Sequence, residues 1–393
     1  MPKTVCGRGP RETASISAMS TLEPQQLERT CATLDRWCAQ DKICGAGLAV
    51  GGSDGTKFLR MFGRHGVAPD SKPMPPDAIF LVASITKPIV CTALLMLVER
   101  GELMLSDPVV RFVPEFAKAG KTDVQVRHLL THTSGLPDML PDNDQLRAAH
   151  EPLATFVSRT VDIGLAFRPG HRVQYQSMGI AMIGEIIRRV TGMDCREFLD
   201  AEILSPLAMG DSVLGTPAHW REGDRHCVSP KANRIAQIRI TPDEAATDWH
   251  WNSDYWRSLG APWGGLLTTP ADLARFCRMM LNGGEMDGVR MLSPQTVDAM
   301  TSNQLACMPD VPEVERRCRP RGLGWWLNHR GTEESFTDLL SSNVYGHWGI
   351  TGTLMWIDPE HDTFFVLLTT EPMAPDGQPY LIRMSNMVAA AIR

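Results

Sequence analysis

Apolar runs near both ends of the chain predict β-hairpins. AGLAVGG (46–52) and TKFLRMFG (56–63) flank the turn Ser53-Asp54-Gly55, in which Asp-Gly is a strong hairpin signal. Near the other end, TLMWI (353–357) and TFFVLLTT (363–370) are separated by a short polar turn. We therefore expect an antiparallel sheet that is built from both ends of the chain.

Helical periodicity covers much of the remaining chain. Residues 86–98 are apolar on nearly every side, with Pro88 in the first turn and Gly101 after the end, which predicts a buried central helix. Other segments show an apolar face or a capping signal at their start. These predicted helices begin near residues 21, 270 and 294 or cover 151–163, 177–191, 195–203 and 379–392.

The order of these elements predicts an α/β chain of the α+β type, in which helices flank a central antiparallel sheet and a mostly helical lobe is inserted. We expect residues 21–104 and 261–393 to form one discontinuous sheet domain and residues 105–260 to form the helical domain. Residues 1–20 lack apolar periodicity, and we expect them to be a flexible tail.

Composition narrows the possible partners. The 393 residues carry a formal net charge of −6 without a run of Lys or Arg, so we expect no nucleic-acid partner. No segment approaches the roughly 18 apolar residues of a membrane span, and the N-terminus has no signal-peptide core. We therefore expect a soluble, cytoplasmic protein without a membrane partner. Its ten cysteines show no CxxC spacing, which favours free thiols.

A Ser-x-x-Lys element stands where the buried central helix begins. In LVASITKPIV, Ser84 and Lys87 are three residues apart and share one face of a helix. The Lys87 amine can therefore reach the Ser84 hydroxyl and take part in its deprotonation. The N–H groups and the positive dipole end at a helix start favour an anion that forms at Ser84.

Two further motifs follow in a fixed order. Tyr175-Gln176-Ser177 comes after a Pro-Gly turn and before a helix, and His347-Trp348-Gly349 leads into the closing hairpin. With these motifs the chain resembles the class C β-lactamases and, more closely, the family VIII carboxylesterases, which share the penicillin-recognising fold. The resemblance extends from about residue 22 over nearly the whole chain and includes the segments LLTHTSGLPD, FRPG, LSPLAMGDS and GGLLTTPADLARF.

The resemblance implies a role for each motif. Ser84 would be the acylated nucleophile and Lys87 with Tyr175 the activating pair, and which of the two is the general base stays open. The backbone N–H groups of Ser84 and Ile350 would form the oxyanion hole. The residues implied to bind substrate are His347, Trp348, Gly349 and Ser177. The implied mechanism passes through a covalent acyl-Ser84 ester and needs no cofactor or metal.

Two departures from the lactamase pattern bear on the substrate. His347 stands where the resemblance implies a lysine, and an unperturbed histidine, with a pKa of about 6.5, is mostly neutral at pH 7. Trp348 replaces a small hydroxyl residue with a large ring. Both changes favour a neutral small-molecule ester over an anionic lactam or peptide terminus.

The expected function is therefore a serine carboxylesterase for short to medium acyl esters, with weak β-lactamase side activity. The alternatives on the same fold are an acyltransferase, a D-aminopeptidase, a DD-peptidase or a β-lactamase, and outside the enzymes a catalytically silent scaffold protein. The sequence predicts no oligomeric state.

Other candidate motifs receive structural interpretations. A literal Gly-x-Ser-x-Gly at 51–55 lacks the strand-to-helix context of a nucleophile elbow, so we expect Ser53 to lie in a hairpin turn. His128 and His132 have helical spacing but no third ligand, which favours a structural role under the site. Several tryptophans are expected in the core or in a pocket wall, namely Trp251, Trp256, Trp263, Trp325, Trp326 and Trp356.

Overall fold

The computed structural model describes residues 21–220, 231–332, 335–373 and 379–393. The predicted flexible tail, residues 1–20, lies outside this range. Within it, no helix is long and apolar enough to cross a membrane. The cysteines of the described residues are all free, namely Cys31, Cys38, Cys44, Cys91, Cys195, Cys277, Cys307 and Cys318.

A six-stranded antiparallel sheet joins the two ends of the chain, in the order β2-β1-β11-β10-β9-β8. Both predicted hairpins are confirmed, because β1 pairs with β2 and β10 pairs with β11. The two hairpins join where β1 pairs with β11, for example with Leu48 opposite Leu367. Its strands are β1 (Gly45–Gly52), β2 (Gly55–Gly63), β8 (Trp326–Leu327), β9 (Tyr345–Gly349), β10 (Thr353–Asp358) and β11 (Thr363–Thr369).

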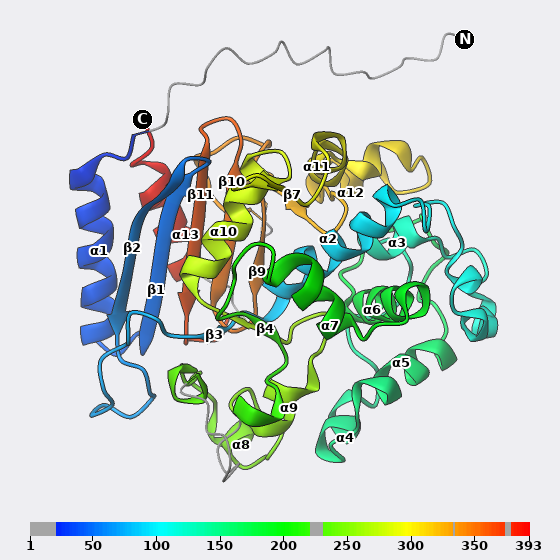
Figure 1. The fold of residues 1–393 in the computed structure, drawn as a ribbon, viewed down its shortest axis with the longest axis horizontal. Coiled ribbons are helices and arrows are strands. Elements are labelled where there is room, and N and C mark those ends of the chain that lie inside the picture. The colour runs from blue at the N-terminus through cyan, green and yellow to red at the C-terminus, as the bar shows by residue number, and fades with distance from the viewer. Residues whose placement is uncertain (1–20, 221–230, 333–334, 374–378) are drawn as a thin grey trace.

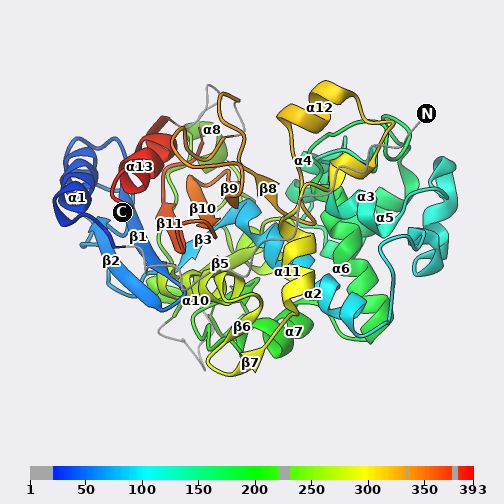
Figure 2. The same ribbon diagram turned by 90° about the horizontal axis from the view of Figure 1, so that it is seen from above.

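Helices cover both faces of this sheet (Figures 1 and 2). The terminal helices α1 (Pro24–Ala39) and α13 (Pro379–Ala389) pack together on one face, where Leu48 and Val50 contribute to the core. On the other face α10 (Pro270–Leu281) crosses β1 and β11. A Cβ atom on Gly47 would lie 2.6 Å from the Pro270 ring, so glycine there permits the close approach of α10. All residues of β1 are buried as a result.

The helical lobe packs against the central helix α2 (Thr86–Glu99), whose residues are buried from Thr86 to Leu97. This explains its apolar character on nearly every side. Helix α6 (Ser177–Thr191) contacts α2, and Figure 1 shows the lobe beside the sheet. The other lobe helices are α3 (Val126–Leu130), α4 (Asn143–Ala148), α5 (Leu153–Asp162), α7 (Cys195–Leu199), α8 (Pro242–Ala245) and α9 (Asp254–Leu259).

A second, three-stranded sheet has the order β3-β5-β4 and lies beside the start of α2. It consists of β3 (Phe80–Leu81), β4 (Val213–Leu214) and β5 (Leu266–Thr268). Residues 105–260 thus contribute one strand, β4, to a sheet. The remaining α-helices and β-strands of the described residues are β6 (Glu285–Met286), β7 (Val289–Arg290), α11 (Pro294–Thr301) and α12 (Glu313–Cys318). The fold is the expected β-lactamase/transpeptidase-like arrangement of an antiparallel sheet with helices.

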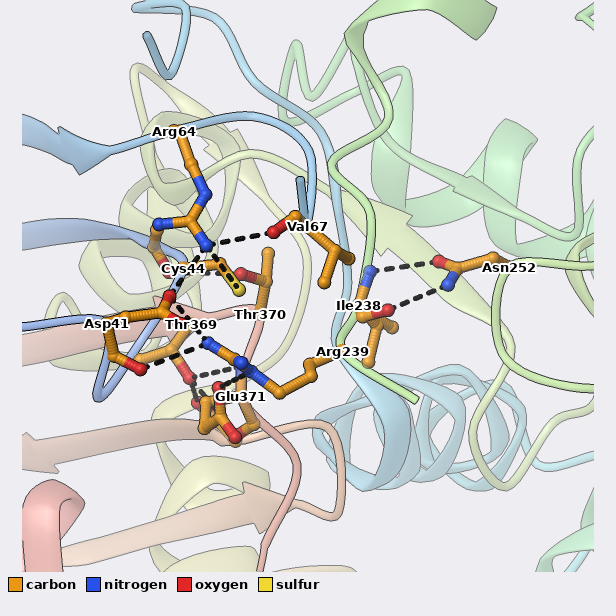
Figure 3. A network of polar contacts seen from close by, with 12 residues as sticks. Asp41, Cys44, Arg64, Val67, Ile238, Arg239, Asn252, Thr369, Thr370 and Glu371 are labelled. Atoms are coloured by element: carbon orange, nitrogen blue, oxygen red, sulfur yellow. Dashed lines mark hydrogen bonds and ion pairs between the residues drawn. The ribbon is translucent and has the colours of Figure 1, made fainter. Parts of the chain in front are cut away.

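A polar network connects the segment just before α8, which contains Arg239, to the large sheet (Figure 3). The Arg239 guanidinium donates to Glu371 Oε2 at 2.7 Å and to Asp41 Oδ1 at 3.0 Å. Arg64 donates to the same Asp41 oxygen at 2.6 Å. Two residues after Glu371, the Met373 N–H donates to the Ile350 carbonyl at 2.8 Å. The network therefore fixes the chain beside the turn that follows β9.

Candidate active site

Ser84 lies in a strained turn at the start of α2. It belongs to the 3₁₀-helix η1 (Ala83–Ile85), and Ala83 has a φ of 46°, in the left-handed region that non-glycine residues rarely adopt. The Thr86 hydroxyl donates to the Ala83 carbonyl at 2.6 Å and accepts the Leu266 N–H at 3.1 Å, which stabilises this conformation. Such strain is typical of functional sites. Ser84 itself stays half-buried, so a small molecule can approach it.

Lys87 contacts Ser84 as its spacing predicted. Its Nζ lies 2.8 Å from Ser84 Oγ and donates to the Trp263 carbonyl at 2.7 Å. The side chain is 1% exposed, and no ion pair engages it within the described residues. Burial disfavours the charged amine and lowers the pKa of Lys87 to about 7, although the charge of Asp138 opposes this fall.

Tyr175 lies beside the same amine, with its ring centroid 4.7 Å from Lys87 Nζ. Burial raises the pKa of Tyr175, and a hydrogen bond with Ser84 counteracts part of the rise. His132 binds the backbone on both sides of Tyr175. Its carbonyl accepts the Gln174 N–H, and its Nδ1 accepts the Gln176 N–H at 3.2 Å. His132 thus has the structural role expected for it, beneath the site.

Asp138 is a site residue that the sequence reasoning missed. Its Oδ1 accepts two hydrogen bonds from Ser177, from the backbone N–H at 3.0 Å and from the hydroxyl at 2.6 Å. The Ser177 hydroxyl, expected to bind substrate, therefore donates inside the protein. Asp138 belongs to the segment LLTHTSGLPD, and only its position beside Lys87 and Tyr175 distinguishes it from other loop carboxylates.

His347 lies at the centre of β9 and is 1% exposed. Its Nδ1 is 2.7 Å from the Trp348 carbonyl, and because a carbonyl only accepts, Nδ1 carries the proton. Burial and the nearby charge of Lys87 lower the pKa of His347 to about 3. The imidazole is therefore neutral well below pH 6.5, the value of an unperturbed histidine.

Aromatic rings surround this histidine. Trp326 of β8 lies 5.3 Å from His347, 5.5 Å from Tyr175 and 6.1 Å from Trp348, measured between ring centroids. Trp348 is half-buried and packs on Phe336 at 6.2 Å. Of the tryptophans considered from the sequence, Trp326 contributes its ring to the site and Trp263 its carbonyl.

The end of β9 lies directly against η1. A Cβ atom on Gly349 would be 2.2 Å from the Val82 carbonyl oxygen, so only glycine fits this approach. Ile350 follows in a turn that the Gly352 N–H closes onto the Gly349 carbonyl at 2.9 Å. The backbone N–H groups of Ser84 and Ile350 thus come from adjacent segments, the arrangement that an oxyanion hole requires.

The competing motifs have structural partners. Ser53 lies in the turn between β1 and β2, and its hydroxyl donates to Asp362 at 2.9 Å. His128 Nδ1 accepts the Gln125 N–H at 3.1 Å and so caps α3. No group of His, Cys, Asp or Glu side chains in the described part of the chain could hold a metal ion.

The fold and this arrangement define an active-site-serine protein of the penicillin-recognising class. A family model described as Beta-lactamase matches residues 25–382, and the chain belongs to this family.

Three relatives illustrate the range of the family. Protein Rv1367c of Mycobacterium tuberculosis (strain ATCC 25618 / H37Rv) is 30% identical over 310 residues, which cover 72% of this chain and 73% of the relative. Esterase EstB of Burkholderia gladioli is 38% identical over 155 residues, 36% of this chain and 39% of that protein. A protein of Escherichia coli O157:H7 named "Putative D-alanyl-D-alanine carboxypeptidase" is 25% identical over 306 residues, 73% of this chain and 67% of the relative.

Solved structures show the same fold. A penicillin-binding protein homologue from Caulobacter crescentus has a TM-score of 0.74 at 23% identity and covers 94% of this chain and 98% of its own. A family VIII carboxylesterase has a TM-score of 0.73 at 19% identity, and the match covers 94% of this chain and 99% of the carboxylesterase chain. The protein is a serine hydrolase of the β-lactamase fold, and proteins named as esterase and as carboxypeptidase both occur among its relatives.

Proposed function

We propose that the protein is a carboxylesterase that hydrolyses short to medium acyl esters through a covalent ester on Ser84. One observation carries the proposal: the Lys87 amine lies 2.8 Å from Ser84 Oγ and has its pKa lowered to about 7 by burial. A large fraction of this amine is neutral at physiological pH and can accept the proton of Ser84.

Acylation begins when the neutral Lys87 amine takes the Ser84 hydroxyl proton and Ser84 Oγ bonds to the ester carbonyl carbon. The carbonyl oxygen becomes an oxyanion, which the backbone N–H groups of Ser84 and Ile350 bind. The bond from this carbon to the alcohol oxygen then breaks. The alcohol leaves with the proton held by Lys87, and the acyl group remains on Ser84.

Deacylation repeats these transfers with water as the nucleophile. Water gives a proton to the neutral Lys87 amine and bonds to the acyl carbon. The bond from this carbon to Ser84 Oγ then breaks, Ser84 Oγ takes the proton held by Lys87, and the carboxylic acid leaves. Because its pKa is raised, Tyr175 stays protonated, which suits a hydroxyl that relays a proton between Lys87 and the departing alcohol. Lys87 is the better base of the pair.

Three features favour an uncharged ester as the substrate. His347 stays neutral, so it offers no fixed charge to a substrate carboxylate. Trp326 and Trp348 line the region of the third motif, and Ile350 exposes apolar surface next to it. The relative EstB carries the name of an esterase. β-Lactam hydrolysis is proposed only as a weak side activity.

The test compares three substrates: p-nitrophenyl butyrate, a chromogenic cephalosporin and a D-amino-acid amide. We expect Ser84-dependent cleavage of the ester to exceed that of the other two in kcat/KM. Ser84→Ala is the inactive variant, and Ser53→Ala, at the competing motif, is the matched control that keeps full activity. Equal ester cleavage by wild type and Ser84→Ala would refute the proposal, and faster cleavage of the amide would favour a peptidase.

A further inference from the structure

The Nε2 atom of His347 is a buried acceptor for which the described residues provide no hydrogen-bond partner. Nδ1 donates its proton to the Trp348 carbonyl at 2.7 Å, so Nε2 presents a lone pair. Nε2 has no hydrogen-bond partner among the described residues, although the side chain is 1% exposed. Buried polar atoms are nearly always paired, and an exception indicates a missing partner.

The surrounding charges keep this nitrogen unprotonated. Lys87 on α2 and Arg321, just before β8, both lower the pKa of His347, and His132 lies in the same cluster of interacting groups. A second proton on His347 would add a positive charge beside the Arg321 guanidinium and the Lys87 amine. Nε2 therefore acts as an acceptor, whereas the lysine implied by the family resemblance would be a donor.

The neighbouring tryptophans offer donors of the complementary kind. The indole Nε1–H groups of Trp326 and Trp348 are also buried and without a hydrogen-bond partner among the described residues. Their rings adjoin His347 and each other, at 5.3 Å from His347 to Trp326 and 6.1 Å between the tryptophans. One acceptor and two donors thus remain unsatisfied at the third motif.

A hydroxyl group satisfies both kinds of atom, because it donates one hydrogen bond and accepts others. A carboxylate only accepts, so it would face the lone pair of His347 with its own lone pairs. The trans amide of a peptide has its N–H and its C=O on opposite sides, whereas a hydroxyl donates and accepts at one atom and can therefore meet the acceptor and a donor together. The chemistry of the three side chains therefore selects a hydroxyl.

We propose that His347, with Trp326, binds a hydroxyl group of the substrate, so that the enzyme prefers esters bearing a neutral hydroxyl near the scissile bond. This inference rests on the proposed esterase function and narrows its substrate class. The hydroxyl belongs either to the acyl group, as in a hydroxyacyl ester, or to the alcohol, as in a partial ester of a polyol.

Two matched pairs of esters test the proposal and distinguish these sources. p-Nitrophenyl 3-hydroxybutyrate against p-nitrophenyl butyrate examines the acyl group, and glycerol monobutyrate against propyl butyrate examines the alcohol. p-Nitrophenyl hydrogen succinate adds a carboxylate. We expect the wild type to favour the hydroxylated member of one pair by about tenfold in kcat/KM, the effect of one hydrogen bond.

Variants of His347 assign the preference to its acceptor atom. His347→Leu removes the acceptor and should abolish the preference, whereas His347→Gln keeps a neutral carbonyl acceptor and should retain part of it. His347→Lys should shift the preference towards the succinate ester. His329→Leu is the matched control, since His329 also has a buried nitrogen that no described residue pairs with, but lines a separate cavity beside β8.

The outcomes separate this inference from the proposed function. If the wild type shows no preference in either pair, the hydroxyl site does not exist, while the esterase function stands. The same follows if the wild type shows a preference and His347→Leu retains it. If ester cleavage persists in Ser84→Ala, the proposed function itself fails. If His347→Leu loses its folded circular dichroism spectrum, the wild-type kcat/KM ratios of the ester pairs and the ratios of His347→Gln still test the hydroxyl site.

Discussion

Asp138 binds Ser177 mainly through one carboxylate oxygen, which accepts the Ser177 N–H at 3.0 Å and its hydroxyl at 2.6 Å, and the Asp138 backbone carbonyl also accepts this N–H at 3.2 Å. Ser177 is the first residue of α6, so the carboxylate lies at the positive end of that helix and stabilises it. The same charge raises the pKa of Lys87 against the effect of burial. One side chain thus both positions the residue that follows Tyr175 and Gln176 and raises the proton affinity of the buried Lys87 amine.

The pH dependence of ester cleavage should report this coupling. If neutral Lys87 is the base, kcat rises with pH through an ionisation near 7, the pKa of Lys87. Asp138→Asn removes the charge that raises this pKa but keeps an acceptor for Ser177, so the rise should move to lower pH. Asp144→Asn, on the exposed surface of α4, is the control and should leave the profile in place. A profile of Asp138→Asn that coincides with the wild type would contradict the coupling.

Removal of Lys87 and of Tyr175 should affect the rate differently. Lys87→Ala loses the base and should lower kcat/KM for p-nitrophenyl butyrate by about 10³-fold, within the range for general-base catalysis. Tyr175→Phe should lower it by about 10²-fold and keep the ionisation near 7, because the base remains. If Tyr175→Phe loses this ionisation instead, Tyr175 is the base and the assignment must be exchanged. Labelling of Ser84 by a fluorophosphonate, in which Ser84 Oγ displaces fluoride from phosphorus, measures the reactivity of the nucleophile without deacylation.

The buried amine of Lys87 should make stability depend on pH. Between pH 7 and the ordinary value of 10.5, the unfolded chain binds a proton at Lys87 that the folded protein does not. The free energy of unfolding of the wild type should therefore rise by about 1.4 kcal/mol per pH unit in this window, relative to Lys87→Met. Below pH 7 both states hold the proton, and the difference between the proteins becomes constant. Urea unfolding at pH 6, 8 and 9 measures it, and parallel curves would show that Lys87 stays charged when folded.

The polar network around Arg239 should contribute to stability. Arg239→Met breaks the contacts with Asp41 and Glu371 and leaves the carboxylate of Glu371 partly buried, where burial already raises its pKa. We expect a loss of about 1–2 kcal/mol, discounted because the guanidinium is 30% exposed.

An exposed ion pair provides the comparison for this network. Arg60 and Asp35 are each 48% exposed, and Arg60→Met should cost less than about 0.5 kcal/mol. Urea unfolding of both variants measures the difference. Equal losses would mean that the network adds no more than surface charge pairs do.

Local chemistry makes several elements predictable from the sequence alone. Asp-Gly between two apolar runs determines a hairpin, and the turn between β1 and β2 lies there. Helices α10 and α11 begin at the predicted Thr269-Pro270 and Ser293-Pro294 signals, where each cap side chain accepts a backbone N–H. Very short strands such as β4 and β8 escaped prediction, because two residues carry no periodicity and form only where a neighbouring strand pairs with them.

By itself, the sequence determined the Ser84–Lys87 spacing, the order of the three motifs and the alternation that builds the sheet, since helix and strand periods are local properties of the chain. Tertiary structure alone decided what these groups are able to do. The fall in the pKa of Lys87 depends on the burial of its amine, which the fold places against the Trp263 carbonyl, and the tautomer of His347 depends on the Trp348 carbonyl of its own strand. Asp138 became a site residue only through its distance from Ser177. Desolvation and hydrogen bonding act through space, so no pattern along the chain records them.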